Sequence, residues 1–130
     1  MADVNRGHRP LSPHLSVYKP QITSISSILI RITGNALIVT AVLLVWWLLG
    51  LATGPEAFET PHRLLTSWFG DLVLVLSVLG LWYHTLGGAR HLLWDTGRGL
   101  EIVTAERLGW GCVVGSVVLT VLTVIFFAVI

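Results

Sequence analysis

Three stretches of the chain are apolar over lengths that suit a membrane crossing. They run over about residues 27–51, 72–93 and 108–130, and few charged side chains interrupt them. A helix needs roughly 20 apolar residues to cross the hydrocarbon core of a bilayer. Because backbone that faces lipid must satisfy its own hydrogen bonds, each stretch is predicted to be an α-helix. We therefore expect an all-α membrane protein with three transmembrane helices.

The segments outside these stretches are polar and contain helix breakers. The breakers between the helices are Thr53-Gly54-Pro55 with Pro61, and Thr96-Gly97-Arg98-Gly99, so both connections are predicted to be loops. Residues 27–130 would then form a three-helix transmembrane anchor. Residues 1–26 lack the apolar core of a cleavable signal peptide. They are either a mobile cytoplasmic tail or an extended segment that contacts partner subunits at the membrane surface.

The composition agrees with a membrane protein. The chain has 130 residues, of which 54% are hydrophobic and 12% charged, whereas soluble domains carry about 25% charged residues. A net charge of +1 gives no reason to expect a nucleic-acid partner. The single cysteine, Cys112, excludes a disulfide framework or a thiolate metal cluster within this chain.

Basic residues are distributed unevenly between the two sides of the predicted bundle. They gather before and at the start of the first helix and around the second loop, whereas the first loop is acidic. The basic set is Arg6, Arg9, Lys19, Arg31, Arg90, Arg98 and Arg107, and the first loop has Arg63 with Glu56, Glu59 and Asp71. The positive-inside rule then places the N-terminus in the cytoplasm and the C-terminus outside. We expect a multi-pass protein of a bacterial inner membrane.

His84 lies deep within the second apolar stretch. Ionisable residues in a membrane usually face a bundle interior and mark a functional site. His91, seven residues on, shares its helix face, and Gly80, Gly87 and Gly88 flank that face. Small residues let a helix or a planar ligand approach the backbone closely. The pattern favours a flat prosthetic group held by His84; a packing histidine is the alternative.

The two histidines of this helix cannot bind one iron together. His84 and His91 are separated along the axis by about 10 Å, whereas two axial ligands of one iron lie about 4 Å apart. The other candidates are remote: His8, His14, His62 and Met1. A bis-histidine haem would therefore need a histidine from another chain. A zinc site would need three or four clustered ligands, which the sequence does not offer.

A second polar group enters the first predicted helix. Ser27 and Arg31 are four residues apart and lie on one helix face. They are expected at the same membrane surface as His91 and Asp95. Arg31 could pair with Asp95, point at a haem propionate or donate to a quinone carbonyl, and the alternative is a snorkelling arginine that anchors the helix end.

Several motifs closely resemble the cytochrome b membrane-anchor subunits of succinate dehydrogenase (respiratory complex II). They are Arg9-Pro10-Leu11-Ser12-Pro13-His14-Leu15, Val17-Tyr18-Lys19, Ser27-Ile28-Leu29, Arg31-Ile32-Thr33-Gly34, and His84 with Gly88, Arg90-His91-Leu92 and Asp95. The resemblance implies that His84 ligates haem b and that a companion anchor subunit supplies the other axial histidine. It also implies a ubiquinone pocket at Ser27 and Arg31, with Arg31 and His91 near the haem propionates.

The chain departs from this family at Ile30, where a histidine is usual. Any proton-delivery or propionate role of that histidine would here be met by water or a neighbouring chain. By resemblance, a flavoprotein subunit oxidises succinate and an iron–sulfur subunit passes the electrons to quinone in the tricarboxylic acid cycle and electron transport. The chain would be a non-succinate-binding subunit of succinate:quinone oxidoreductase, with no catalytic residue of its own. The alternatives are a haem-free structural anchor and an anchor of a quinol:fumarate reductase.

Overall fold

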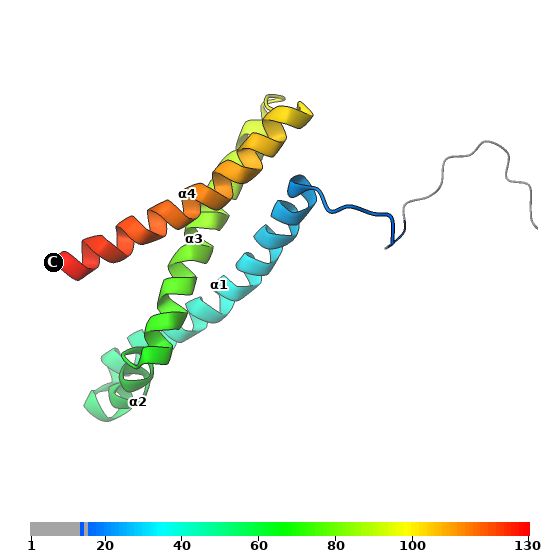
Figure 1. Ribbon diagram of the computed structural model, residues 1–130. Helices are drawn as coiled ribbons and strands as arrows, with labels where there is room; N and C mark the ends of the chain where they lie inside the picture. The colour runs from blue at the N-terminus through cyan, green and yellow to red at the C-terminus, as the bar shows by residue number, and fades with distance from the viewer. Residues whose placement is uncertain (1–13, 15) are drawn as a thin grey trace, which may run out of the picture.

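The structure is a computed structural model, and it describes residues 14 and 16–130. The elements in chain order are α1 (Ile22–Thr53), α2 (Pro55–Leu65), α3 (Trp68–Asp95) and α4 (Ile102–Val129) (Figure 1). Helices α1, α3 and α4 are long and apolar enough to cross a membrane, which confirms the three predicted spans. Most of the predicted N-terminal segment, including His8 and Arg9 to Pro13, lies outside the described residues.

The observed helices extend beyond the predicted limits. Residues 22–26, which the sequence places in the N-terminal segment, are the first five residues of α1. Helix α3 likewise starts before residue 72, and α4 starts at Ile102 rather than at residue 108. Helices run on into the polar interfacial layer because nothing in the backbone requires them to stop where the apolar residues do.

The first connection is a helix, so the prediction of a loop there is wrong. Pro55 is the first residue of α2, where the missing N–H has no helical partner to lose. Gly54 has φ of 141°, which allows the chain to reverse direction. Pro61 is buried against α1, and the Cβ that Gly50 lacks would lie 2.9 Å from the Ala57 carbonyl oxygen. Pro55 therefore begins α2, and Pro61 packs this helix against α1.

Helices α1 and α3 form an antiparallel pair. Residues of increasing number on α1 meet residues of decreasing number on α3: Ser26 meets Arg90, Ile30 lies over Gly87, and Thr40 is hydrogen-bonded to Ser77 at 2.8 Å. Each of these contacts brings small or polar atoms close to the partner helix. Close approach of this kind is how helices associate within lipid, where apolar surface alone does not drive them together.

Helix α4 packs mainly on α3. Its buried residues are all small, and they are Ala105, Gly109, Cys112, Ser116 and Thr120. Leu86 of α3 fills the space beside Gly115, whose missing Cβ would lie 3.0 Å from a Leu86 methyl. Towards its C-terminus, α4 leads away from α1 and α3 (Figure 1). The helices are thus joined most closely at the end where α1 and α4 begin and α3 ends, called the Arg90 end below.

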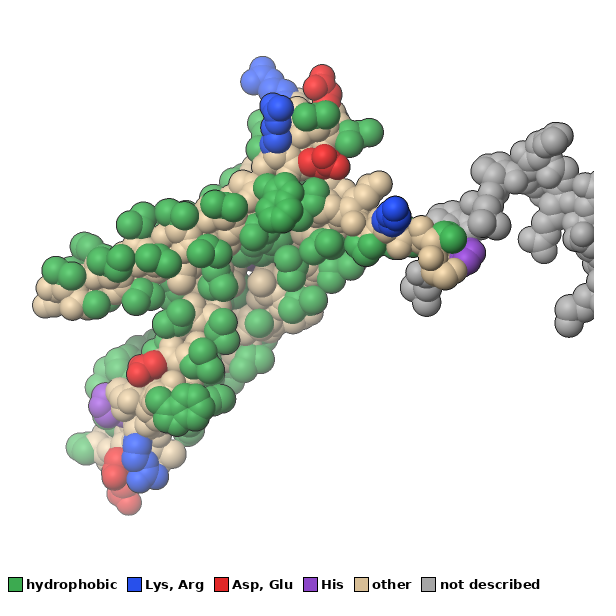
Figure 2. All heavy atoms as spheres, viewed as in Figure 1, with side chains coloured by type: hydrophobic (Ala, Val, Ile, Leu, Met, Phe, Trp, Pro, Cys, Tyr) green, Lys and Arg blue, Asp and Glu red, His purple; other side chains and the backbone are tan. Residues whose placement is uncertain are grey.

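The surface is apolar along the length of the bundle. Figure 2 shows hydrophobic side chains over the three long helices, with charged side chains gathered towards the two ends. Large residues such as Ile38, Val42 and Ile125 are more than half exposed. A continuous apolar band with polar ends matches the profile of a bilayer, so the surface supports a transmembrane arrangement.

Candidate functional site

The sequence-predicted site residues lie on one face of the α1–α3 pair. On α1, residues at i, i+4 and i+7 share a face, and the same spacing recurs on α3. We call this surface the open face, and it consists of Ser27, Arg31 and Gly34 of α1 with His84, Gly88 and His91 of α3. The two rows are brought together by one contact, since the Cβ that Gly34 lacks would lie 3.1 Å from Cε1 of His84.

The open face points away from α4. Two residues that directly precede its members meet α4 instead: Arg90 Nη1 lies 3.6 Å from where a Gly109 Cβ would be, and Ser26 Oγ lies 3.9 Å from the same point. One step along a helix rotates the side chain by about 100°. Ser27 and His91 are therefore turned out of the three-helix junction onto the opposite surface.

His84 is exposed in this chain. It does not face the interior of this single chain, because the preceding residue, Tyr83, occupies the interior position and is buried. The His84 ring rests on α1 at Gly34, where there is no side chain to cover it. A charged residue that does face the interior is Arg90, which is only 4% exposed.

The three glycines that flank His84 divide into two kinds. Gly80 and Gly87 pack against α1, with the missing Cβ atoms 3.9 Å from Thr33 and 2.5 Å from Ile30. Gly88 differs, because no described residue lies within 4 Å of the Cβ it lacks. Gly88 is one turn from His84 towards the Arg90 end. A bare stretch of helix therefore lies beside the exposed imidazole.

His91 and Arg31 are both exposed at the Arg90 end of the open face. Nδ1 of His91 is 2.7 Å from the Gly87 carbonyl oxygen. A carbonyl only accepts, so Nδ1 carries a proton and donates, and Nε2 is the nitrogen left for another partner. Within residues 14 and 16–130, no three His, Cys, Asp or Glu side chains are grouped to hold a metal ion. A metal at His84 would need ligands from a cofactor or another chain.

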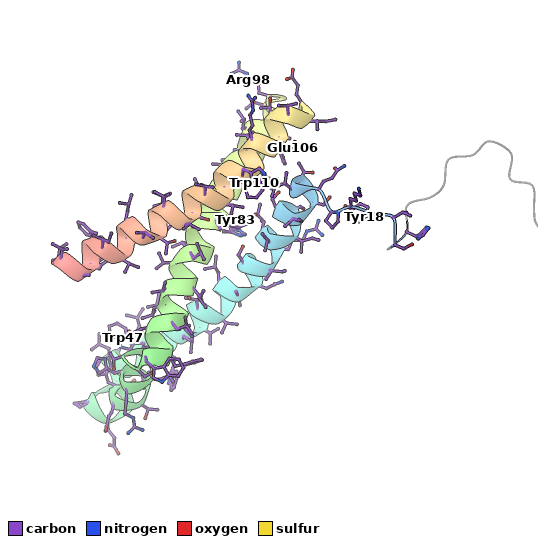
Figure 3. The ribbon with its side chains drawn as sticks, in the orientation of Figure 1. Tyr18, Trp47, Tyr83, Arg98, Glu106 and Trp110 are labelled. Carbon is purple, nitrogen blue, oxygen red and sulfur yellow. The ribbon has the colours of Figure 1, made fainter. Side chains whose placement is uncertain are left out.

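Three residues that sequence reasoning left without a role form a hydrogen-bonded cluster behind the open face. Tyr83 Oη donates to the Ser26 carbonyl oxygen at 3.1 Å, and Arg90 Nη1 donates to Ser26 Oγ at 2.9 Å. Figure 3 shows Tyr83 where α3 passes between α4 and α1. A signal was available, because Tyr83 and Arg90 are seven residues apart and share a helix face, like His84 and His91.

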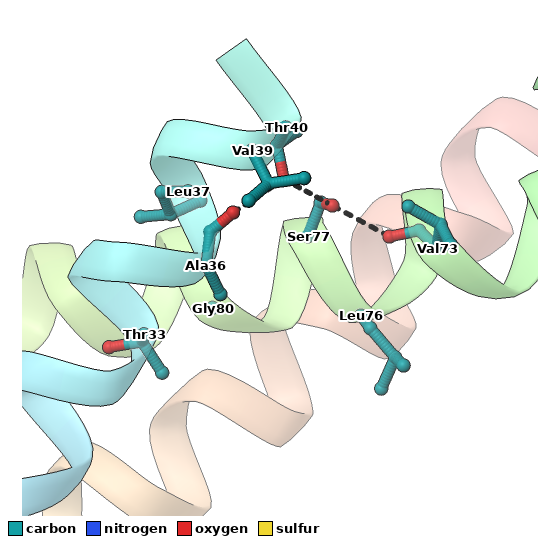
Figure 4. A pocket seen from close by; sticks show the side chains of 9 residues that line it. All are labelled: Thr33, Ala36, Leu37, Val39, Thr40, Val73, Leu76, Ser77 and Gly80. Atoms are coloured by element: carbon teal, nitrogen blue, oxygen red, sulfur yellow. Dashed lines mark hydrogen bonds between the residues drawn. The ribbon is translucent and has the colours of Figure 1, made fainter. Parts of the chain in front are cut away.

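A separate hollow of about 340 Å³ lies in the other half of the α1–α3 pair. Two of the three hydroxyl residues in its lining, Thr40 and Ser77, are hydrogen-bonded to each other at 2.8 Å (Figure 4). The rest of its lining is apolar apart from Thr33. The predicted site residues lie elsewhere, on the open face, so this hollow is not the predicted site.

Comparison with known proteins places the whole chain in one group. Residues 5–123 match the family model described as succinate dehydrogenase/fumarate reductase transmembrane subunit. The succinate dehydrogenase cytochrome b556 subunit of Paracoccus denitrificans is 51% identical over 129 residues, covering 99% of each chain. The cytochrome b556 subunit of Rickettsia conorii is 44% identical and covers 88% of this chain and 89% of its own.

A more distant relative has the same kind of name. The succinate dehydrogenase cytochrome b560 subunit of Reclinomonas americana is 38% identical, covering 79% of this chain and 75% of its own. The family-model match includes both helices that form the open face, and the fold agrees with the description of a transmembrane subunit. The chain therefore belongs to the succinate dehydrogenase/fumarate reductase transmembrane subunit family, together with the cytochrome b subunits of succinate dehydrogenase.

Proposed function

We propose that this chain is the haem b-binding membrane subunit of a succinate dehydrogenase, and that it helps to form the site of ubiquinone reduction. The observation that carries the proposal is the exposed His84 ring at membrane depth, beside Gly34 and the bare helix surface at Gly88. Its relatives are named as cytochrome b subunits, which supports haem b as the group at this position.

The residues of the open face fit a haem. His84 would hold the haem iron through an imidazole nitrogen, and Gly88 would leave room for a flat ring to approach α3. Arg31 and His91 lie at the Arg90 end, where they can pair with propionates. When bound, haem b takes up and releases one electron at a time. A second histidine for the iron would have to come from a companion anchor subunit, which would cover the open face.

The quinone site is assigned to Ser27 and Arg31. Ser27 is half-buried and Arg31 exposed, one helical turn apart on the same side of α1. A hydroxyl and a guanidinium can donate hydrogen bonds to the carbonyl oxygens of ubiquinone and stabilise the charge that develops during reduction. The reaction takes two electrons and two protons. The electrons come from an iron–sulfur subunit, and no residue of this chain binds succinate.

The Arg90 end is proposed to face the cytoplasm of a bacterium whose inner membrane holds the complex. The basic residues at this end support that orientation through the positive-inside rule. The N-terminal segment would contact the iron–sulfur and flavoprotein subunits there. Electrons and protons would then reach the quinone from one side, so turnover should move no net charge across the membrane of a proteoliposome.

Ile30 has a structural role in this chain. Its side chain lies in the α1–α3 contact, where the missing Cβ of Gly87 would be 2.5 Å from Cδ1 of Ile30. An apolar residue here cannot carry a proton to the quinone. Proton delivery is therefore assigned to water or to a group of a neighbouring chain.

The quinone assignment is tested on the complete complex. We expect Ser27→Ala and Arg31→Ala to lower ubiquinone reduction at least tenfold, while succinate oxidation by an artificial dye stays intact. Ser77→Ala and Arg98→Ala are matched controls, because these residues lie in the other half of the bundle and in the second connection. Unchanged ubiquinone reduction in both test variants would refute the site. The absence of a b-type band from the purified complex would favour the haem-free anchor instead.

A further inference from the structure

We propose that Tyr83 and Arg90 are positioning residues for quinone binding: together they hold Ser26, and through it they fix Ser27 and Arg31 relative to His84. The inference rests on the quinone site proposed above. Its basis is that α3 binds one residue of α1 twice. Tyr83 Oη reaches the Ser26 carbonyl oxygen at 3.1 Å, and Arg90 Nη1 reaches the Ser26 hydroxyl at 2.9 Å.

The start of α1 depends on contacts of this kind. Gln21 precedes the first helical residue, and its side chain makes no capping hydrogen bond. The first turn of a helix has free N–H groups and frays unless it is capped or packed. Ser26 lies just after that turn and is fully buried, and its hydroxyl also donates to the Thr23 carbonyl oxygen at 3.0 Å. The two hydrogen bonds from α3 to Ser26 therefore stabilise the turn of α1 that carries Ser27.

The two turns of α3 from Tyr83 to His91 carry residues of both groups, the hydrogen-bonded cluster at Ser26 and the open face. Tyr83 directly precedes His84, and Arg90 directly precedes His91. The first member of each couple faces Ser26, and the second lies on the open face. A displacement of α1 against α3 would thus alter the distance between the quinone-binding residues and the histidines. The contacts at Ser26 oppose that displacement.

The burial of Arg90 at this place is energetically unfavourable. The residue is 4% exposed, and the partners of its guanidinium are neutral: the Ser26 hydroxyl and the Trp94 ring, whose centroid is 4.7 Å from Cζ. Among the described residues, none accepts a hydrogen bond from its buried Nε. A charged group within a membrane bundle is destabilising unless it is well paired. An apolar contact would join the helices at lower cost, so helix packing alone does not account for Arg90.

The test is the ubiquinone KM of the complete complex with Tyr83→Phe, which removes a single oxygen atom. Loss of one hydrogen bond corresponds to about a two- to tenfold change in equilibrium. We expect the KM to rise by about that factor while kcat, dye-linked succinate oxidation and haem content are retained. Ser26→Ala, which removes the acceptor of Arg90, should act in the same direction. Ser77→Ala is the matched control, because it also removes an α1–α3 hydrogen bond, the one to Thr40, but in the other half of the pair.

The outcomes separate this inference from the proposal beneath it. If Ser27→Ala raises the KM but Tyr83→Phe and Ser26→Ala leave it unchanged, positioning through Ser26 is refuted and the quinone site stands. If Ser27→Ala and Arg31→Ala both leave quinone reduction unchanged, the quinone site fails and the inference fails with it. If Tyr83→Phe and Ser26→Ala lose haem and dye-linked activity together with quinone reduction, the cluster only holds the fold, which also overturns the inference.

Discussion

Gly34 of α1 and His84 of α3 are in direct contact, with the position of the missing Gly34 Cβ only 3.1 Å from Cε1 and 3.6 Å from Nδ1 of the imidazole. The ring of the proposed haem ligand thus lies on bare backbone of the neighbouring helix. Because α1 also carries Ser27 and Arg31, this contact links the orientation of the ligand to the helix of the quinone site.

A methyl group at position 34 should reorient the imidazole. The 3.1 Å distance is short enough that Gly34→Ala forces the ring to move by a few tenths of an ångström. We expect the complex to assemble with nearly full haem content but with shifted g-values in the electron paramagnetic resonance spectrum of the oxidised haem. Gly111→Ala is the control, since no described residue lies within 4 Å of that position. Identical spectra for Gly34→Ala and the unaltered complex would contradict the contact.

A large side chain at position 88 should exclude haem without disturbing the chain. Gly88 and Gly111 are both exposed glycines with free space around the missing Cβ in the described structure, but only Gly88 lies beside His84. We expect Gly88→Leu to reach the membrane at normal abundance with at least tenfold less haem, measured by pyridine haemochrome. Gly111→Leu should retain its haem. Equal haem content in the two variants would show that the bare surface at Gly88 is not the haem face.

The contact between Ile30 and Gly87 should appear as energetic coupling. Gly87→Ala places a methyl group against the Ile30 side chain, and overpacking of this kind costs about 1–3 kcal/mol. Ile30→Ala removes the atoms that would clash. We therefore expect the double variant to unfold in a detergent titration with about 1 kcal/mol less destabilisation than the sum of the single variants. Simple additivity would mean that the two residues do not meet.

Sequence patterns predicted the spans well, because lipid imposes the same requirement on every residue of a crossing helix. The predicted loop at α2 failed for a different reason. As helix breakers, Pro55 and Pro61 predict a loop, yet proline at the first helical position is favourable. A proline after glycine with an acidic residue next is itself a start signal, and the packing of Pro61 on α1 depends on tertiary contacts.

The open face was predictable from helical spacing, since Ser27 with Arg31 and His84 with His91 share faces in any regular helix. Helical spacing alone could not predict which face of each helix is buried against its neighbours. Ser26 and Ser27 are equally polar, and only the packing of α3 and α4 decides that Ser26 is buried and Ser27 is half-buried. An intramembrane arginine was a signal for the role of Arg90, but its partner lies 64 positions away in the sequence.

The proposed orientation predicts which side of the membrane each connection reaches. In a Cys112→Ser background, Arg98→Cys should react with an impermeant maleimide only in inverted vesicles stripped of peripheral subunits. Glu59→Cys, in α2, should react only in right-side-out spheroplasts. Both parent residues are exposed and lie at opposite ends of the bundle. The reverse pattern would place the Arg90 end outside and would separate it from the iron–sulfur subunit.

The most direct test of the account is the reduced-minus-oxidised spectrum of the complete purified complex with His84→Ala, compared with His91→Ala. If His84 is the axial ligand of a haem shared with a companion subunit, His84→Ala should lose the low-spin b-type band or convert it to a high-spin form. His91→Ala should keep the band and shift only the midpoint potential. An unchanged low-spin band in His84→Ala, or its loss in His91→Ala alone, would contradict the assignment of His84.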